Sequence, residues 1–255
     1  MFKGWMIFTA ILAFTGPCGA HAQEPVTEPA QMPAPASAQE QAPTQVPATV
    51  EKAGWFDEFM PPSLASAGLF AGGAITALLA HESCHLLANG VFGNKPQLQN
   101  ANYLGFVPFP AISSNIYCDG EQCYHGDGAR FGGGPKGFYT ISTAGLECQQ
   151  IGDEIILTAN PELRFRPAPF EKGMLALNTL LSIGYALSNW TGTEPYVGDL
   201  ATADRTVRTP RGIVALSVFV PAVLDIVRYF LPGSNWAIWA SRTSKFGLIG
   251  LTFAT

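Results

Sequence analysis

Charged residues are scarce in this chain. Asp, Glu, Lys and Arg make up only 13% of the 255 residues, and the formal net charge is −5. No run or patch of Lys and Arg occurs, which argues against nucleic acid as a partner. The mean hydropathy of +0.18 is high for a soluble enzyme and low for a protein with several membrane spans. This composition indicates an apolar domain diluted by a polar segment.

Large apolar side chains are almost absent from Gln23 to Val50, a segment rich in Pro, Ala and Gln. Such a segment cannot bury enough surface to fold, so we expect a disordered linker. A short stretch with Trp55, Phe56 and Phe59 follows it, and this stretch suits a membrane interface. We therefore assign residues 23–60 as a linker with an interfacial end.

Residues 1–22 have the pattern of a secretory signal. Lys3 supplies the charged start, Trp5 to Phe14 forms the apolar core, and Ala20-His21-Ala22 is an A-x-A cleavage site. A retained signal anchor is the alternative. In either case we expect the chain to be exported or inserted, with a bacterial inner membrane as the expected location.

Histidine is scarce as well, yet two of the four histidines form the H-E-x-x-H motif His81-Glu82-Ser83-Cys84-His85. The motif lies in an apolar helical run from Leu64 to Asn89. Residues four apart share a helix face, so His81 and His85 can bind one Zn²⁺, with Glu82 beside it as general base for metal-assisted hydrolysis. The alternatives are hydrogen bonds between packed helices, or ligation of another cofactor with Cys84 nearby. Ionisable groups in such an apolar run mark a functional site.

Four helical segments outline a membrane-embedded domain over residues 61–231. Ser63 is the expected N-cap of the first helix, whose Gly- and Ala-rich stretch from Ala71 to Ala77 would let a neighbouring helix approach closely. The other segments are Tyr139 to Ala159, Gly173 to Asn189 and Arg211 to Leu231. The predicted fold is mainly α, a polytopic membrane helix bundle, with residues 232–255 as a C-terminal tail.

The long connector after the H-E-x-x-H helix, Gly90 to Phe138, is predicted to be an irregular or re-entrant loop or a hairpin over the site. Cys118 and Cys123 lie within it. They would form a disulfide in an oxidising compartment and stay free thiols in the cytoplasm. His125 is a further possible ligand, with a solvated histidine as the alternative.

Orientation follows from the length of the first helix. His81 would lie about 27 Å from Ser63, near the far side of a hydrocarbon core about 30 Å thick. If the signal is cleaved and this helix spans once, the site opens toward the cytoplasm and Cys118 and Cys123 are free thiols.

These features resemble the site-2 protease family of intramembrane zinc metalloproteases. In that family a Phe-Gly turn follows the H-E-x-x-H helix, and further motifs read G-P-x-x-N and, after a proline, L-D-G. The corresponding segments here are Val91-Phe92-Gly93, Gly145-Leu146-Glu147-Cys148-Gln149 and Pro221-Ala222-Val223-Leu224-Asp225. Leu146, Gln149 and Ile226 stand where the family has Pro, Asn and Gly.

The resemblance spans about Leu64 to Leu231 and implies a zinc-dependent intramembrane endopeptidase. Its expected partners are the lipid bilayer and a polypeptide substrate within the membrane. Asp225 would complete the metal site, and Gln149 would bind the unwound substrate strand. Glu154 and Glu147 are the alternative third ligands, as in gluzincin-type sites where a glutamate comes from a later helix.

Two other functions remain open from the sequence. One is a membrane-anchored gluzincin-type protease that acts on the exported side. The other is a non-catalytic membrane binding or assembly protein that retains the motif for packing.

Overall fold

The computed structural model describes residues 63–103, 107–193, 198–206, 210 and 212–252. The signal sequence assigned to residues 1–22 and the linker assigned to residues 23–60 lie outside this part. All described residues belong to one compact unit, Trp55–Thr255.

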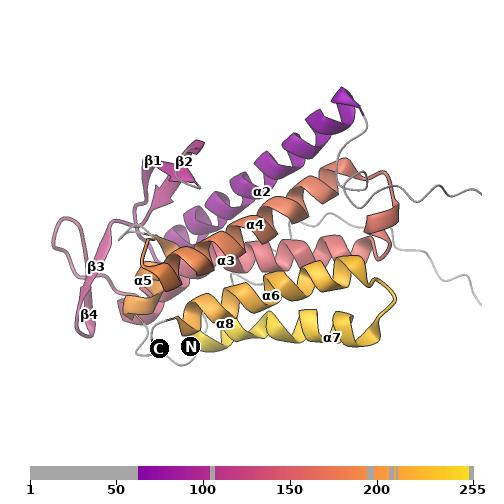
Figure 1. Ribbon diagram of the computed structural model, residues 1–255. Coiled ribbons are helices and arrows are strands. Elements are labelled where there is room, and N and C mark those ends of the chain that lie inside the picture. The colour runs from indigo at the N-terminus through magenta and orange to yellow at the C-terminus, as the bar shows by residue number, and fades with distance from the viewer. Residues whose placement is uncertain (1–62, 104–106, 194–197, 207–209, 211, 253–255) are drawn as a thin grey trace, which may run out of the picture. The chain divides into compact units, whose positions relative to one another are not determined.

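The described part is mainly helical, as predicted (Figure 1). Helix α2 packs against both α3 and α4, α4 packs against α6, and α7 lies along α6. The helices are α2 (Leu64–Val91), α3 (Gly134–Ala159), α4 (Pro169–Thr191), α5 (Asp199–Thr206), α6 (Ile213–Phe230), α7 (Asn235–Ser244) and α8 (Phe246–Thr252), with a 3₁₀ turn at Leu163–Phe165.

The connector after α2 forms two antiparallel hairpins. The hairpin alternative is therefore confirmed, and the irregular or re-entrant loop is not what the structure contains. Pro108 and Pro110 favoured an irregular segment, but both lie in β2, which pairs with β1 along one edge only, and an edge strand tolerates residues without an N–H. Both hairpins and α5 lie at the end of the bundle where α2 finishes (Figure 1). The strands are β1 (Gln97–Tyr103), β2 (Val107–Ser113), β3 (Ile116–Asp119) and β4 (Gln122–His125).

Helix α2 begins as the sequence predicts. The Ser63 side chain accepts a hydrogen bond from the Ser66 N–H at 3.1 Å, which satisfies one of the donors that the first turn leaves open. The predicted close approach of a neighbouring helix is also confirmed. A Cβ on Gly73 would lie 2.0 Å from the Phe170 carbonyl oxygen, and a Cβ on Gly173 would lie 2.0 Å from the Phe70 oxygen. Helices α2 and α4 therefore touch backbone to backbone.

This contact predicts opposite effects for two adjacent glycines. We expect Gly73→Ala to destabilise the fold by about 1–3 kcal/mol, because the new methyl group would force two backbones apart. Gly72→Ala is the matched control, since a Cβ there meets nothing within 4 Å and alanine is the better helix former by about 1 kcal/mol. Unfolding midpoints measured in detergent should move in opposite directions, and equal shifts would contradict the packing of α4 on Gly73.

The C-terminal residues are not a simple tail. The segment assigned as a tail from residue 232 forms α7 and α8, and Leu248 of α8 is fully buried. The Tyr139 hydroxyl of α3 donates to the Leu248 carbonyl oxygen at 3.3 Å. The short length of each helix concealed this packing from a search for membrane-length apolar runs.

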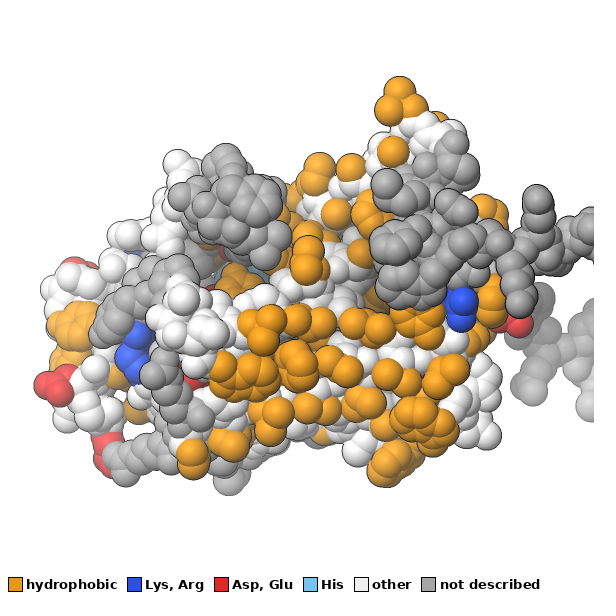
Figure 2. Space-filling view, in the orientation of Figure 1, with side chains coloured by type: hydrophobic (Ala, Val, Ile, Leu, Met, Phe, Trp, Pro, Cys, Tyr) orange, Lys and Arg blue, Asp and Glu red, His pale blue; other side chains and the backbone are white. Residues whose placement is uncertain are grey.

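Two described helices, α2 and α6, are long and apolar enough to cross a membrane. Helix α2 exposes a row of large apolar side chains, and α4 and α6 continue the apolar surface with Leu180, Leu187 and Leu216. Figure 2 shows hydrophobic side chains along the helices, while the charged side chains visible in that view lie mainly toward the two ends. The exposed side chains of α2 include Leu69, Ile75, Leu79, Leu86 and Leu87.

Candidate metal centre

Three potential metal ligands converge where α2 meets the start of α5. His81 and His85 lie one turn apart on α2, and their Nε2 atoms are 3.1 Å apart. The Asp199 Oδ2 atom lies 3.1 Å from the Nε2 atom of His81 and 3.3 Å from that of His85. Within the described residues, this is the group of His, Cys, Asp and Glu side chains that could hold a metal ion.

The spacing of these three atoms suits a small metal ion. Zn²⁺ binds nitrogen and oxygen ligands at about 2.0–2.2 Å in tetrahedral geometry, which separates neighbouring ligand atoms by about 3.3 Å. The observed separations of 3.1 to 3.3 Å match that edge length. Two imidazoles and one carboxylate are also a common donor set for zinc when a further position stays open. The residues present therefore fit a divalent metal.

The surroundings orient the His85 ring toward the cluster and keep Asp199 ionised. His85 Nδ1 lies 2.8 Å from the Ile141 carbonyl oxygen, which can only accept. Nδ1 therefore carries a proton, and Nε2 is the ring nitrogen that faces the cluster. Burial alone would raise the pKa of the Asp199 carboxyl, but His85 and His81 more than offset this and lower that pKa below its usual range. Asp199 thus presents a carboxylate to the two rings.

Glu82 has the buried position expected of a general base. Its side chain is 7% exposed, and its Oε2 atom accepts a hydrogen bond from the Ile112 N–H of β2 at 2.6 Å. This bond fixes the carboxylate next to the cluster in the first turn beyond His81. The hairpin β1–β2 therefore orients Glu82, a role that the sequence did not indicate.

Helix α3 closes one side of the cluster with a glycine. A Cβ on Gly145 would lie 2.5 Å from the Nε2 atoms of both His81 and His85. Because any side chain there would occupy the space of the rings, Gly145 allows the α3 backbone to reach the ligands. On another side, the Tyr185 ring of α4 lies parallel to the His81 ring, with centroids 6.3 Å apart.

Two disulfides lie near this end of the bundle. Cys84, inside the H-E-x-x-H motif, is bonded to Cys148 of α3. Cys118 and Cys123 are bonded across the β3–β4 hairpin. The free thiols expected for a cytoplasmic loop are therefore not what the structure contains.

Asp225, the favoured third ligand, lies elsewhere in the bundle. It is buried on α6, where its Oδ1 atom accepts a hydrogen bond from the Ser241 hydroxyl at 2.6 Å. The same oxygen forms an ion pair with the Lys245 Nζ atom at 2.9 Å. The third position of the cluster thus belongs to Asp199 and not to Asp225. Lys245, the residue between α7 and α8, compensates the buried charge that had suggested a metal ligand.

The alternative third ligands also have other partners. Glu154 binds three cations, Arg228 at 2.7 Å, Arg242 at 2.8 Å and Lys245 at 3.0 Å. Arg228, which lies three residues beyond Asp225 on α6, therefore pairs with Glu154 of α3. Glu147 accepts a hydrogen bond from the Thr143 hydroxyl at 3.0 Å.

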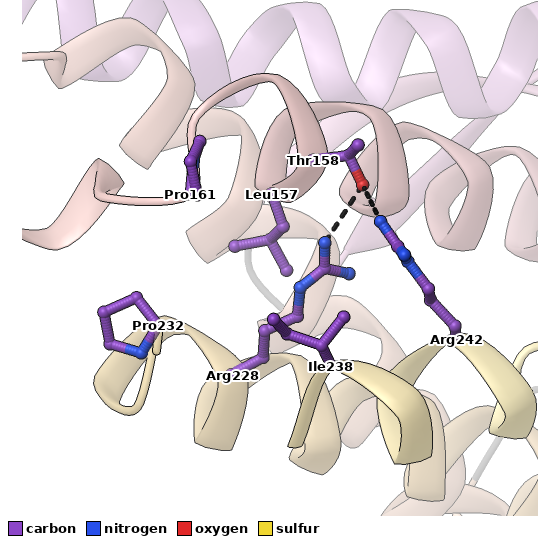
Figure 3. Close-up of a pocket in the computed structure, with 7 residues that line it drawn as sticks. All are labelled: Leu157, Thr158, Pro161, Arg228, Pro232, Ile238 and Arg242. Carbon is purple, nitrogen blue, oxygen red and sulfur yellow. Dashed lines mark hydrogen bonds between the residues drawn. The ribbon is translucent and has the colours of Figure 1, made fainter. Parts of the chain in front are cut away.

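Figure 3 shows Arg228 and Arg242 converging on the Thr158 hydroxyl beside a cavity of about 140 Å³. This charged cluster joins α3, α6 and α7. Its α3 members are Glu154 and Thr158.

The two remaining predicted residues differ in their surroundings. Gln149 is 2% exposed, and neither polar atom of its amide has a hydrogen-bond partner among the described residues. It lies one turn beyond Gly145 on α3, so it remains a candidate for substrate binding. His125 Nδ1 donates to the Asn94 Oδ1 atom at 2.8 Å, and this side chain lies outside the cluster.

Asp199 is the site residue that sequence reasoning missed. It begins α5, between the predicted helices Gly173 to Asn189 and Arg211 to Leu231, and it is more than a hundred residues from the histidines. Its only local signal is an acidic residue at the start of a short helix between two apolar ones. Many connectors contain such a residue, so the pattern alone does not select it.

The described residues thus combine three convergent ligand atoms, an adjacent buried carboxylate and a glycine wall. Chemically, this set can hold a divalent cation and accept a proton beside it. No protein-family model, curated protein or solved structure matches this chain.

Proposed function

We propose that this protein is a membrane-embedded zinc endopeptidase related in mechanism to site-2 proteases. The observation that carries the proposal is the convergence of His81, His85 and Asp199 next to Glu82 at the end of an apolar helix. Zinc bound there would polarise the scissile carbonyl and make water more acidic.

Each residue of the proposed site has a defined part in this reaction. His81, His85 and Asp199 bind the metal. Glu82, oriented by the Ile112 N–H, takes a proton from the attacking water and passes it to the departing amine. Gly145 keeps side-chain atoms away from the ligands, and Gln149 offers an amide to a substrate backbone.

The membrane location rests on the outward-facing apolar surface. Only 22% of the most apolar 18-residue stretch of α2 is buried within the protein. A monomeric soluble protein rarely exposes such a continuous row of large apolar side chains. We infer a bundle in which α2 and α6 cross the bilayer, with the proposed substrate a membrane polypeptide.

The two disulfides favour a second candidate, a membrane-anchored protease whose site faces the exported side. Cys118–Cys123 lies in a hairpin beside the site, and Cys84–Cys148 lies within one helical turn of the ligands. Disulfides persist in oxidising compartments and are rare in the cytoplasm. This observation supports substrates that reach the metal centre from the exported side, opposite to the orientation expected from helix length.

Metal removal tests the proposal directly. We expect the full chain, purified in detergent, to cleave an unfolded polypeptide reporter, to lose that activity on treatment with a chelator, and to regain it with one equivalent of Zn²⁺. A protein that hydrolyses the reporter equally with and without metal would not be a metalloprotease. Stoichiometric zinc with no cleavage of soluble or membrane reporters would support a non-catalytic binding role instead.

A further inference from the structure

The disulfide between Cys84 and Cys148 lies in the contact between α2 and α3, beside the two histidine ligands. On α3, Ile141, Gly145 and Cys148 are spaced by four and then three residues, so they share one helix face. On α2, Cys84 is adjacent to His85 in sequence and one turn beyond His81. The bond joins two helices whose cysteines are 64 positions apart in the chain.

Each residue of this α3 face contacts the metal-binding turn. The Ile141 carbonyl oxygen sets the tautomer of His85 at 2.8 Å. The Gly145 backbone approaches both imidazoles so closely that a Cβ would lie 2.5 Å from their Nε2 atoms. Cys148 then binds Cys84 covalently. The Ile141 and Gly145 contacts act directly on the histidine ligands. The disulfide holds together the two helices between which these contacts are made.

The ligand atoms come from α2 and α5, and α3 contributes none of them. Gly145 adds no side chain to this part of the contact, where Cys84 packs against the buried cluster that includes Ala88, Ile141 and Ala144. The covalent bond to Cys148 holds α3 against these ligands whether or not a metal is present.

We propose that the Cys84–Cys148 disulfide is a positioning element of the metal centre, which keeps the Ile141 carbonyl and the Gly145 backbone against His81 and His85 and thereby raises metal affinity. This inference rests on the proposed metal centre. It assigns to the cysteine inside the H-E-x-x-H motif a role that the motif itself does not specify. The second disulfide, Cys118–Cys123, closes a hairpin of sequence separation 5 and does not join α2 to α3.

Zinc affinity of the full chain, measured by competition with a chromophoric chelator, tests the proposal. We expect the double variant Cys84→Ala/Cys148→Ala to bind Zn²⁺ about 10- to 100-fold more weakly, the loss typical of groups that orient metal ligands. The matched control is Cys118→Ala/Cys123→Ala, which should bind zinc as the wild type does. Equal affinity in the wild type and the first variant, or equal losses in both variants, would overturn the proposal.

A second arm avoids substitution of the bridging cysteines. The Cys118→Ala/Cys123→Ala protein retains Cys84–Cys148 and can be reduced with a phosphine after folding. Reduction should lower its zinc affinity at least tenfold while far-ultraviolet circular dichroism stays unchanged, and unchanged zinc affinity after reduction would also overturn the proposal. Affinity is read without substrate, so a wild type that binds zinc but cleaves nothing removes the protease proposal alone. A wild type that binds no zinc overturns both.

Discussion

Glu82→Gln should lower the rate of peptide hydrolysis by about 10²- to 10⁴-fold, the usual contribution of a general base, while zinc remains bound. Glutamine has nearly the same shape as glutamate, and its amide oxygen can still accept the Ile112 N–H bond that holds this side chain. It cannot take a proton from water. Reporter cleavage and bound zinc, measured on the same preparation, separate the two effects.

A suitable control is Glu162→Gln, since Glu162 is an exposed acid in the connection between α3 and α4. Its cleavage rate should equal that of the wild type. Wild-type hydrolysis by the Glu82→Gln protein would rule out the proposed mechanism. Joint loss of activity and zinc would show that Glu82 supports the site structurally and is not its base.

Asp199→Asn should weaken zinc binding by more than the roughly 10- to 100-fold typical of residues that only orient ligands. The substitution keeps the shape of the side chain but removes the charge that lies 3.1 and 3.3 Å from the two imidazole nitrogens. A neutral amide oxygen is a poorer zinc ligand than a carboxylate. Competition with a chelator gives the change in affinity directly.

Asp225→Asn is the natural comparison, because sequence patterns favour this residue as the ligand. We expect normal zinc affinity and a stability loss below the about 3–5 kcal/mol typical of a broken buried ion pair. Lys245 keeps Glu154 as a second partner at 3.0 Å, which limits the loss. Loss of zinc in Asp225→Asn with full affinity in Asp199→Asn would restore the assignment made from the L-D motif.

The parts of this protein that follow local rules could be predicted from sequence. The Ser63 cap, the apolar run of α2 and the facing pair His81 and His85 each depend on residues within one or two turns of one another. Helical periodicity encodes such relations directly. The small residues around Gly73 likewise indicated a close neighbour, although the sequence did not identify α4 as that neighbour.

The parts that depend on distant segments could not be predicted. Asp199 reaches the histidines only because α5 packs against α3, and nothing near Asp199 in sequence records that contact. Asp225 looked like a ligand because its neutralising partner, Lys245, lies between α7 and α8, in the segment that was expected to be a tail. The pairing of Cys84 with Cys148 was similarly hidden, whereas a Cys118–Cys123 disulfide was one of the two expected outcomes.

The reciprocal contact of Gly73 with Phe170 and of Gly173 with Phe70 restricts how the two halves of the bundle can move. Neither helix can slide along the other there, because each glycine sits against a backbone carbonyl of its partner. Rotation about this crossing remains, so the contact acts as a pivot. His81 and Tyr185 lie beyond it on the two helices, and a small change of crossing angle is magnified at that distance. A swing of α4 about Gly73 would therefore move Tyr185 away from His81 while the two glycine contacts stay in place.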